Sequence, residues 1–262
     1  MSQIIYGRHP VLAALKRQEA PLEEVIIAQG AAGPWLAEVR RLAQAAGVRL
    51  RVQERAALDR LAGGAAHQGI VARRGSYGYR REDELLDQVA ALEGPALLLA
   101  ADGLTDPMNL GNLCRSALAA GTHGLIIPKD RAVGLTATVA KAAAGALEYL
   151  PVYRVTNLAE CLRRLKDAGL WIMGTAAGEA RTLYEADLTI PLVLVIGSED
   201  KGMRPRVRRQ CDQVLSIPLA APEMGSLNAA SAGAVALFEV RRQRLKLSAV
   251  SRQLSAKNKE TD

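Results

Sequence analysis

Leu192-Val193-Leu194-Val195-Ile196-Gly197-Ser198-Glu199 is the stretch of this sequence that decides the fold. A continuous apolar run of this kind is typical of a strand that is covered on both faces of a sheet. The run passes at once into Gly, Ser and Glu, and ligand sites in α/β proteins form where parallel strands end. The sequence therefore predicts a buried strand with a site at its carboxyl end.

Other apolar runs in the C-terminal part of the chain have the same character, at residues 97–99, 125–127, 171–173 and 214–217. Helical patterns lie between them, at 110–120, 137–146, 158–168 and 205–210, with a long one at 227–243. Strands that alternate with helices predict a parallel α/β sheet.

The first part of the chain reads as a separate, small α/β unit. Strands are predicted at 25–27, 48–52 and 69–72, and helices at 10–17, 34–46 and 56–61. The sequence then becomes polar and basic, which favours a linker. We predict a first domain at 1–74, a linker at 75–93, a second domain at 94–247 and a disordered tail at 248–262.

The composition favours a globular protein with an anionic partner. The chain has 262 residues, 49% of them hydrophobic, and a formal net charge of +7. A basic excess makes nucleic acid the first partner to consider. Aromatic residues are only 3%, which argues against a surface that binds single strands mainly by stacking bases. RNA recognition would then depend on phosphate charge, shape and the 2'-hydroxyl.

The spacing of the cysteines and the hydropathy of the sequence indicate the cellular compartment of the protein. Cys114, Cys161 and Cys211 are far apart and form no CxxC pair, which argues against a disulfide scaffold and a zinc site. Cys114 is expected to be a buried thiol. The N-terminus has no signal-peptide pattern, and no apolar stretch is long enough to span a bilayer. We expect a cytoplasmic protein with no metal and no membrane partner.

Two common nucleotide-binding motifs are missing. The strand at 97–101 is followed by residues 102–107, Asp-Gly-Leu-Thr-Asp-Pro, which lack the GxGxxG fingerprint of a dinucleotide site. Residues 197–202 have the GxxxxG spacing of a phosphate loop, but Met203 and Arg204 follow where Lys and Ser or Thr are needed.

Three polar segments lie at boundaries between predicted elements: 106–115, 197–203 and 217–228. In the first, Asp106 and Pro107 predict a helix start. Gly111 and Arg115 then share a helix face, where the bare Gly leaves space for the Arg head to meet a ligand. In the third, Ser226 has the character of a helix N-cap. Each feature alone also has an ordinary structural explanation.

Together, the three segments resemble the SpoU family within the SPOUT superfamily of RNA ribose 2'-O-methyltransferases. The matching signatures are N-x-G-x-x-x-R at 109–115, G-x-E-x-x-G at 197–202 and S-L-N at 226–228. Residues 174–179 resemble the family's cofactor-side loop. Residues 7–15 and 67–72 resemble a small substrate-binding domain of a ribosomal-protein type, present in one branch. That branch includes the bacterial enzyme that methylates a guanosine ribose in 23S ribosomal RNA.

The resemblance implies a C-terminal parallel-sheet SPOUT domain with a deep trefoil knot near residues 199–228, and an N-terminal domain that binds the RNA substrate. It also implies S-adenosylmethionine bound in the knot, and a homodimer whose active site uses both subunits. The implied activity is 2'-O-methylation of a guanosine ribose in 23S ribosomal RNA.

The resemblance further implies roles for individual residues. The residues expected to contact the cofactor are Gly197, Ile217, Leu227, Thr175, Ala176, Gly178, Ser198, Gly202 and Pro218. The residues expected around the reacting ribose are Arg115, Asn109, Glu199, Ser226 and Asn228. Because guanidinium groups stay protonated in proteins, our hypothesis is that Arg115 binds a substrate phosphate or the developing alkoxide instead of acting as the base.

Three other interpretations are weighed against this one. A tRNA ribose methyltransferase of the same family, and an RNA-binding ribosome assembly factor that has lost activity, both stay open. A small-molecule α/β enzyme is disfavoured by the basic charge and by the missing nucleotide motifs.

Overall fold

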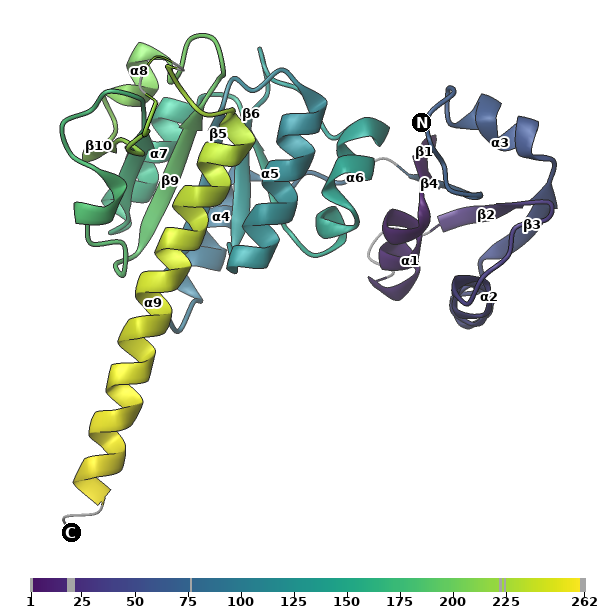
Figure 1. The fold of residues 1–262 in the computed structure, drawn as a ribbon, viewed down its shortest axis with the longest axis horizontal. Coiled ribbons are helices and arrows are strands. Elements are labelled where there is room, and N and C mark those ends of the chain that lie inside the picture. The colour runs from purple at the N-terminus through teal and green to yellow at the C-terminus, as the bar shows by residue number, and fades with distance from the viewer. Residues whose placement is uncertain (1, 18–21, 76, 222, 224, 260–262) are drawn as a thin grey trace. The chain divides into compact units, whose positions relative to one another are not determined.

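The computed structural model describes residues 2–17, 22–75, 77–221, 223 and 225–259, and Figure 1 labels its elements. The elements form two sheets, and each sheet is described here with its own helices. Among the described residues, no helix is long and apolar enough to cross a membrane.

The smaller sheet has the strand order β1-β4-β2-β3. Its strands are β1 (Ser2–Tyr6), β2 (Leu22–Ala28), β3 (Arg49–Gln53) and β4 (Ile70–Gly75), and its helices are α1 (Arg8–Arg17), α2 (Trp35–Ala45) and α3 (Arg55–Leu61). Strand β4 is antiparallel to β1 and to β2, whereas β2 and β3 are parallel. Strands β1, β2 and β3 therefore run in the same direction, and their carboxyl ends lie at one edge of the sheet.

The larger sheet has the order β10-β8-β9-β5-β6-β7. Its strands are β5 (Leu97–Asp102), β6 (Gly124–Pro128), β7 (Val152–Val155), β8 (Trp171–Thr175), β9 (Leu192–Gly197) and β10 (Gln213–Leu215). The pairs β10–β8, β8–β9, β9–β5 and β5–β6 are parallel. This confirms the predicted parallel α/β sheet, although β7 is not among the predicted strands.

Strand β9 lies inside this sheet and is buried along its whole length. Val193 and Val195 belong to an apolar cluster that includes residues of α4 (Glu82–Ala90) and α7 (Leu158–Asp167). The helix α9 (Ala229–Lys259) also contacts β9. Burial of both faces explains the uninterrupted apolar run, since each such side chain contributes about 1.5–3 kcal/mol when buried.

Helix α9 is fixed to the amino ends of β5 and β9. The Arg244 guanidinium donates hydrogen bonds to the carbonyl oxygens of Pro95, Ala96 and Ile190, at 2.7, 2.9 and 2.7 Å. Figure 1 shows α9, in yellow, running along the sheet and extending well beyond it. The first turn of α9 accordingly lies toward the carboxyl ends of the strands.

Two ranges of the expected domain organisation contain helices. Part of the expected linker is the helix α4, whose Leu85 is completely buried. The range 248–262, expected to be a disordered tail, includes the end of the helix α9 at Lys259, and residues 260–262 lie outside the described residues. Seven of the twelve residues at 248–259 are Ala, Lys, Arg, Gln or Leu, which lose little freedom in a helix, so a polar sequence does not exclude a helix here.

The remaining helices have local start signals. Helix α5 (Pro107–Ala120) begins where the Asp106 carboxylate accepts hydrogen bonds from the backbone N–H groups of Met108 and Asn109, at 3.0 and 3.2 Å, which confirms the predicted cap. Thr136 caps α6 (Ala137–Ala143) in the same way. Helix α8 (Pro205–Arg208) starts with proline, whose fixed φ suits a first helical position. In the described part of the chain, short 3-10 helices cover 146–148 and 183–185.

Candidate active site

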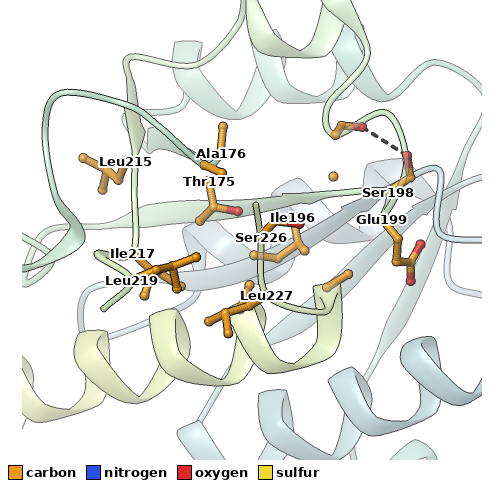
Figure 2. A pocket seen from close by; sticks show the side chains of 15 residues that line it. Thr175, Ala176, Ile196, Ser198, Glu199, Leu215, Ile217, Leu219, Ser226 and Leu227 are labelled. Carbon is orange, nitrogen blue, oxygen red and sulfur yellow. Dashed lines mark hydrogen bonds between the residues drawn. The ribbon is translucent and has the colours of Figure 1, made fainter. Parts of the chain in front are cut away.

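A pocket of about 220 Å³ lies at the carboxyl ends of β8, β9 and β10, beside the first turn of α9. Figure 2 shows Ile217 and Leu219 on one side of this pocket, with Ser198 and Glu199 on the other. Parallel strands bring their carboxyl ends to one edge of a sheet, so three segments distant in sequence meet here.

The lining can be compared with the residues predicted from the sequence. The predicted cofactor residues in the lining are Thr175, Ala176, Gly197, Ser198, Gly202, Ile217 and Leu227. Glu199 and Ser226, predicted to act near the reacting group, also line it. Gly178, Pro218 and Asn228 are outside the described lining. The pocket therefore joins the second and third polar segments of the sequence.

Gly197 is required by the loop that closes beside it. Ser198 and Gly202 exchange backbone hydrogen bonds of 3.1 and 3.0 Å, which fold residues 198–202 back on the end of β9. A Cβ atom on residue 197 would lie only 2.8 Å from the Cα atom of Gly202 and would collide with the Gly202–Met203 peptide. Glycine at position 197, which the resemblance implies as a cofactor contact, is therefore also needed for the loop to fold back against the end of β9.

A buried carboxylate that sequence reasoning missed holds the same loop. Asp102, at the end of β5, is completely buried. It accepts a 2.7 Å hydrogen bond from the backbone N–H of Arg204 and a 2.6 Å bond from the Arg204 Nε. The pairing of Asp102 with Gly197 in the β5–β9 ladder places this ion pair directly beside the pocket strand. Asp102 is a positioning residue for the loop at 198–204.

The start of α9 corrects one interpretation of the sequence. The cap of this helix is Asn228, whose Oδ1 accepts hydrogen bonds from the backbone N–H groups of Ala230 and Ser231, at 2.9 and 3.3 Å. The interpretation of Ser226 as a cap is wrong, because the helix begins two residues too late for that. Ser226 is exposed and lines the pocket, whereas Asn228 shapes the turn that leads into α9.

The first polar segment lies on α5. Arg115 is exposed, Asn109 is buried at 8% exposure, and Cys114 is completely buried, as expected for a structural thiol. Burial raises the pKa of Cys114 to about 12. The expectation that Gly111 leaves space for the Arg115 head is wrong, because α6 fills that space. A Cβ on residue 111 would clash with Ala142 and would lie 2.7 Å from the Val139 carbonyl oxygen.

The pocket offers a mixed surface. Leu215, Ile217, Leu219 and Leu227 provide apolar contacts beside backbone groups at the strand ends. Such a lining suits a flat, partly apolar ring system with a few polar atoms. The Glu199 carboxylate at one side favours a ligand that carries positive charge. Among the described residues, no group of three or more His, Cys, Asp and Glu could hold a metal ion.

Comparison with known proteins adds independent information. The model of the SpoU rRNA Methylase family matches residues 96–238, and the model named RNA 2'-O ribose methyltransferase substrate binding matches residues 4–79. The chain is 44% identical over 244 residues to the 23S rRNA (guanosine-2'-O-)-methyltransferase RlmB of Escherichia coli (strain K12), which covers 93% of this chain and 100% of that relative.

Solved structures agree with this assignment. The SpoU methyltransferase AviRb from Streptomyces viridochromogenes matches with a TM-score of 0.78 at 26% identity, over 94% of this chain and 90% of that one. The same enzyme in complex with the cofactor AdoMet matches with a TM-score of 0.75 at 27% identity, over 93% and 91% of the two chains. The pocket lies inside the segment matched by the methylase model, and the chain belongs to the SpoU rRNA methylase family.

Proposed function

We propose that this protein transfers a methyl group from S-adenosylmethionine to the 2'-oxygen of a guanosine ribose in 23S ribosomal RNA. One observation carries the proposal: the 44% identity to an Escherichia coli enzyme of that printed activity, over 93% of this chain and all of the relative. Relatives that share both domains favour ribosomal RNA over tRNA as the substrate.

The pocket at the ends of β8, β9 and β10 is the proposed cofactor site, and its residues fit the molecule. The apolar side chains of Ile217, Leu219 and Leu227 suit an adenine ring, while the Glu199 carboxylate suits the positive charge of the ligand. S-adenosylmethionine supplies an electrophilic methyl group when bound. Gly178 and Pro218 are proposed to touch its outer parts, with Ser198 and Gly202 contacting it from the loop after β9.

Arg115, Asn109, Glu199, Ser226 and Asn228 are proposed to act at the ribose end. Methyl transfer to a weakly acidic hydroxyl needs alignment of the two reactants and removal of a proton. A protonated guanidinium cannot accept that proton, so Arg115 is assigned to a substrate phosphate or the developing alkoxide. We propose that Arg115 reaches the ribose from the partner subunit of a homodimer, as family membership implies.

Family membership also supports three structural proposals. The chain near residues 199–228 forms a trefoil knot around the cofactor site. Residues 1–74 form an RNA substrate-binding domain, 75–93 connect it, and 94–247 form the methyltransferase domain. The protein acts in the cytoplasm, where its proposed ribosomal RNA substrate is made.

Mapping of ribose methylation by mass spectrometry tests this function. Ribosomal and transfer RNA are compared between cells with and without the gene for this protein. We expect loss of one 2'-O-methylguanosine from 23S ribosomal RNA and restoration by the wild-type gene. Loss from a tRNA instead would identify the other substrate class. If the methylation map is unchanged and the purified protein does not bind S-adenosylmethionine in calorimetry, a catalytically silent assembly factor is favoured.

A further inference from the structure

We propose that a polar hollow in the smaller sheet's domain binds one unpaired nucleotide of the RNA substrate. The hollow has a volume of about 430 Å³ and is lined by Arg8, Trp35, Arg55, Gln68, Gly69 and the stretch 28–32. This inference rests on the proposed function and deepens it, because it says which residues of the N-terminal domain hold the RNA.

The fold places the hollow where a ligand site is expected. Strands β1, β2 and β3 are parallel to one another and end at Tyr6, Ala28 and Gln53. Residues 28–32 follow the end of β2, Gln68 and Gly69 precede the antiparallel strand β4, and each of α1, α2 and α3 contributes its first residue: Arg8, Trp35 and Arg55. Loops at the carboxyl ends of neighbouring parallel strands form the ligand crevices of α/β sheets.

Hydrogen bonds hold the walls of the hollow together. The Gln68 Oε1 accepts a 3.0 Å bond from the backbone N–H of Arg8. The backbone N–H of Ala28 donates to the Gly69 carbonyl oxygen at 3.0 Å, and that of Gln29 donates to the Gln53 carbonyl oxygen at 2.7 Å. The loops from β1, β2, β3 and β4 are thereby tied to one another, so little ordering is needed when a ligand binds.

A flat cationic surface forms one part of the hollow. The Arg8 guanidinium lies over the Trp35 ring, 4.8 Å from its centroid, and the Trp35 Nε1 donates a 3.2 Å hydrogen bond to the Ala32 carbonyl oxygen. That bond fixes the orientation of the ring. A guanidinium stacked on an indole keeps its in-plane N–H donors available and offers its outer face to another planar group.

The charges of the hollow are not neutralised by the described part of the chain. Arg8 and Arg55 are exposed, and neither has a carboxylate partner among the described residues. Other arginines of the same sheet do have one: Arg51 and Arg73 both pair with Glu24, at 3.4 and 3.2 Å. Two unneutralised guanidinium groups at one hollow are suited to a phosphodiester, which they recognise through paired N–H donors.

An unpaired nucleotide fits these features better than a duplex. In the proposed complex, Arg8 and Arg55 bind a phosphate while a base stacks on the Arg8–Trp35 surface, and only an unstacked base can enter a hollow in this way. A volume of about 430 Å³ is within the range of small-molecule pockets, roughly 300–1,000 Å³. A single stacking position also agrees with an aromatic content of only 3%.

Fluorescence of Trp35 tests the proposal directly. The chain has two Trp residues, so a Trp171→Phe background leaves Trp35 as the only indole reporter. The probes are a short single-stranded oligouridylate and a blunt RNA duplex of the same length. We expect the single strand to quench Trp35 fluorescence and the duplex to leave it unchanged. Trp35→Leu, followed by anisotropy of a labelled single strand, should weaken binding by about tenfold.

The arginines are tested with a charge-matched control. Arg8→Gln and Arg55→Gln should each weaken single-strand binding several-fold and lower the salt dependence by about 0.7 in log–log slope, as expected for one lost phosphate contact. Arg40→Gln removes the same charge from an exposed position of α2 outside the hollow, and should change the affinity less than twofold. Equal behaviour of the three variants, or equal quenching by the duplex, would overturn the proposal.

A second readout separates this inference from the proposed function. With 23S ribosomal RNA and saturating S-adenosylmethionine, Arg8→Gln and Arg55→Gln should raise the KM for RNA more than they lower kcat. Normal methylation kinetics in both variants would overturn the hollow as an RNA site while the methyltransferase assignment stands. A wild-type protein that methylates no 23S ribosomal RNA would refute the proposed function. The oligonucleotide binding data would still show whether the hollow binds single-stranded RNA.

Discussion

At the scale of single residues, position 197 is the one where the fold of the pocket loop most specifically requires glycine. In Gly197→Ala, the new Cβ would meet the backbone of Gly202 and Met203, so the loop after β9, which lines the pocket, must shift. We expect a loss of about 1–3 kcal/mol in the free energy of unfolding and at least a tenfold loss of S-adenosylmethionine affinity, measured by urea unfolding and calorimetry.

Gly94→Ala is the control for that substitution, because nothing lies within 4 Å of a Cβ at residue 94. Gly94→Ala should leave the free energy of unfolding and the S-adenosylmethionine affinity nearly unchanged. Equal cofactor affinity in Gly197→Ala and Gly94→Ala would mean that the loop does not form the cofactor pocket.

Arg115 is the residue on which the proposed chemistry depends most. Arg115→Ala should lower the single-turnover rate of methyl transfer by about 10²- to 10³-fold, because a charge-stabilising group would be lost. Arg115→Lys should give an intermediate rate, since it keeps the charge but not the forked donors. Cofactor affinity should stay unchanged in both. An Arg115→Ala protein with weaker RNA binding but a normal single-turnover rate would contradict this role.

At the scale of elements, the contact between the end of β5 and the loop before α8 positions the pocket. Asp102→Asn removes a fully buried charge that pairs with Arg204. Because the Arg204 side chain is 40% exposed and can turn toward water, we expect a moderate loss of about 2 kcal/mol in unfolding free energy. Cofactor affinity should fall several-fold, since the loop at 198–204 loses its anchor.

Asp130→Asn, an isosteric change at an exposed position, is the matched control for Asp102→Asn. Calorimetric titration with S-adenosylmethionine should show several-fold weaker binding for Asp102→Asn than for Asp130→Asn. If Asp102→Asn bound the cofactor as tightly as Asp130→Asn, Asp102 would not be a positioning residue.

The strands of the sheets are predictable to different degrees, for a physical reason. Strands β5 and β9 are covered on both faces and so carry continuous apolar runs, which the sequence shows directly. Strands β1 and β7 lie at the edges of their sheets and contain polar or charged residues, so no such run marks them. Helix α4 resembles a linker in sequence because its buried Leu85 is surrounded by charged residues.

The pocket is predictable where its residues form short local motifs and not elsewhere. Gly197, Glu199 and Ser226 stand in recognisable segments, so the sequence alone indicates them. Asp102 escapes prediction because its partner Arg204 is 102 positions away, and no local pattern marks such a pair. The space beside Gly111 is misjudged for a similar reason, since the helix α6 that fills it is also distant in sequence.

At the scale of the whole molecule, we expect the buried thiols of Cys114 and Cys161 and the partly buried thiol of Cys211 to make stability fall in alkali. Burial raises the pKa of Cys114 and Cys161 to about 12 and that of Cys211 to about 11, from 9.0. Above pH 9 the unfolded chain releases thiol protons that the folded chain retains, so unfolding becomes more favourable as pH rises. Each group should contribute a fall of about 1.4 kcal/mol per pH unit between its two pKa values.

Urea unfolding at a series of pH values between 8 and 11 measures this slope. In Cys114→Ala, the free energy of unfolding should decline less steeply above pH 9, because one thiol no longer contributes. The difference in unfolding free energy between Cys114→Ala and wild type at pH 8 reports only the change in packing. An identical slope in wild type and Cys114→Ala would show that this thiol does not retain its proton in the folded state.

The central claim for the whole molecule is that this chain holds a methyl donor against a ribose oxygen of 23S ribosomal RNA. The most direct measurement incubates the purified protein with unmodified 23S ribosomal RNA and S-adenosylmethionine labelled in its methyl group, digests the RNA, and identifies the labelled nucleoside by mass spectrometry. We predict label in 2'-O-methylguanosine, and its loss in Arg115→Ala. Label on a base, or an absence of label while the protein binds S-adenosylmethionine, would contradict the account.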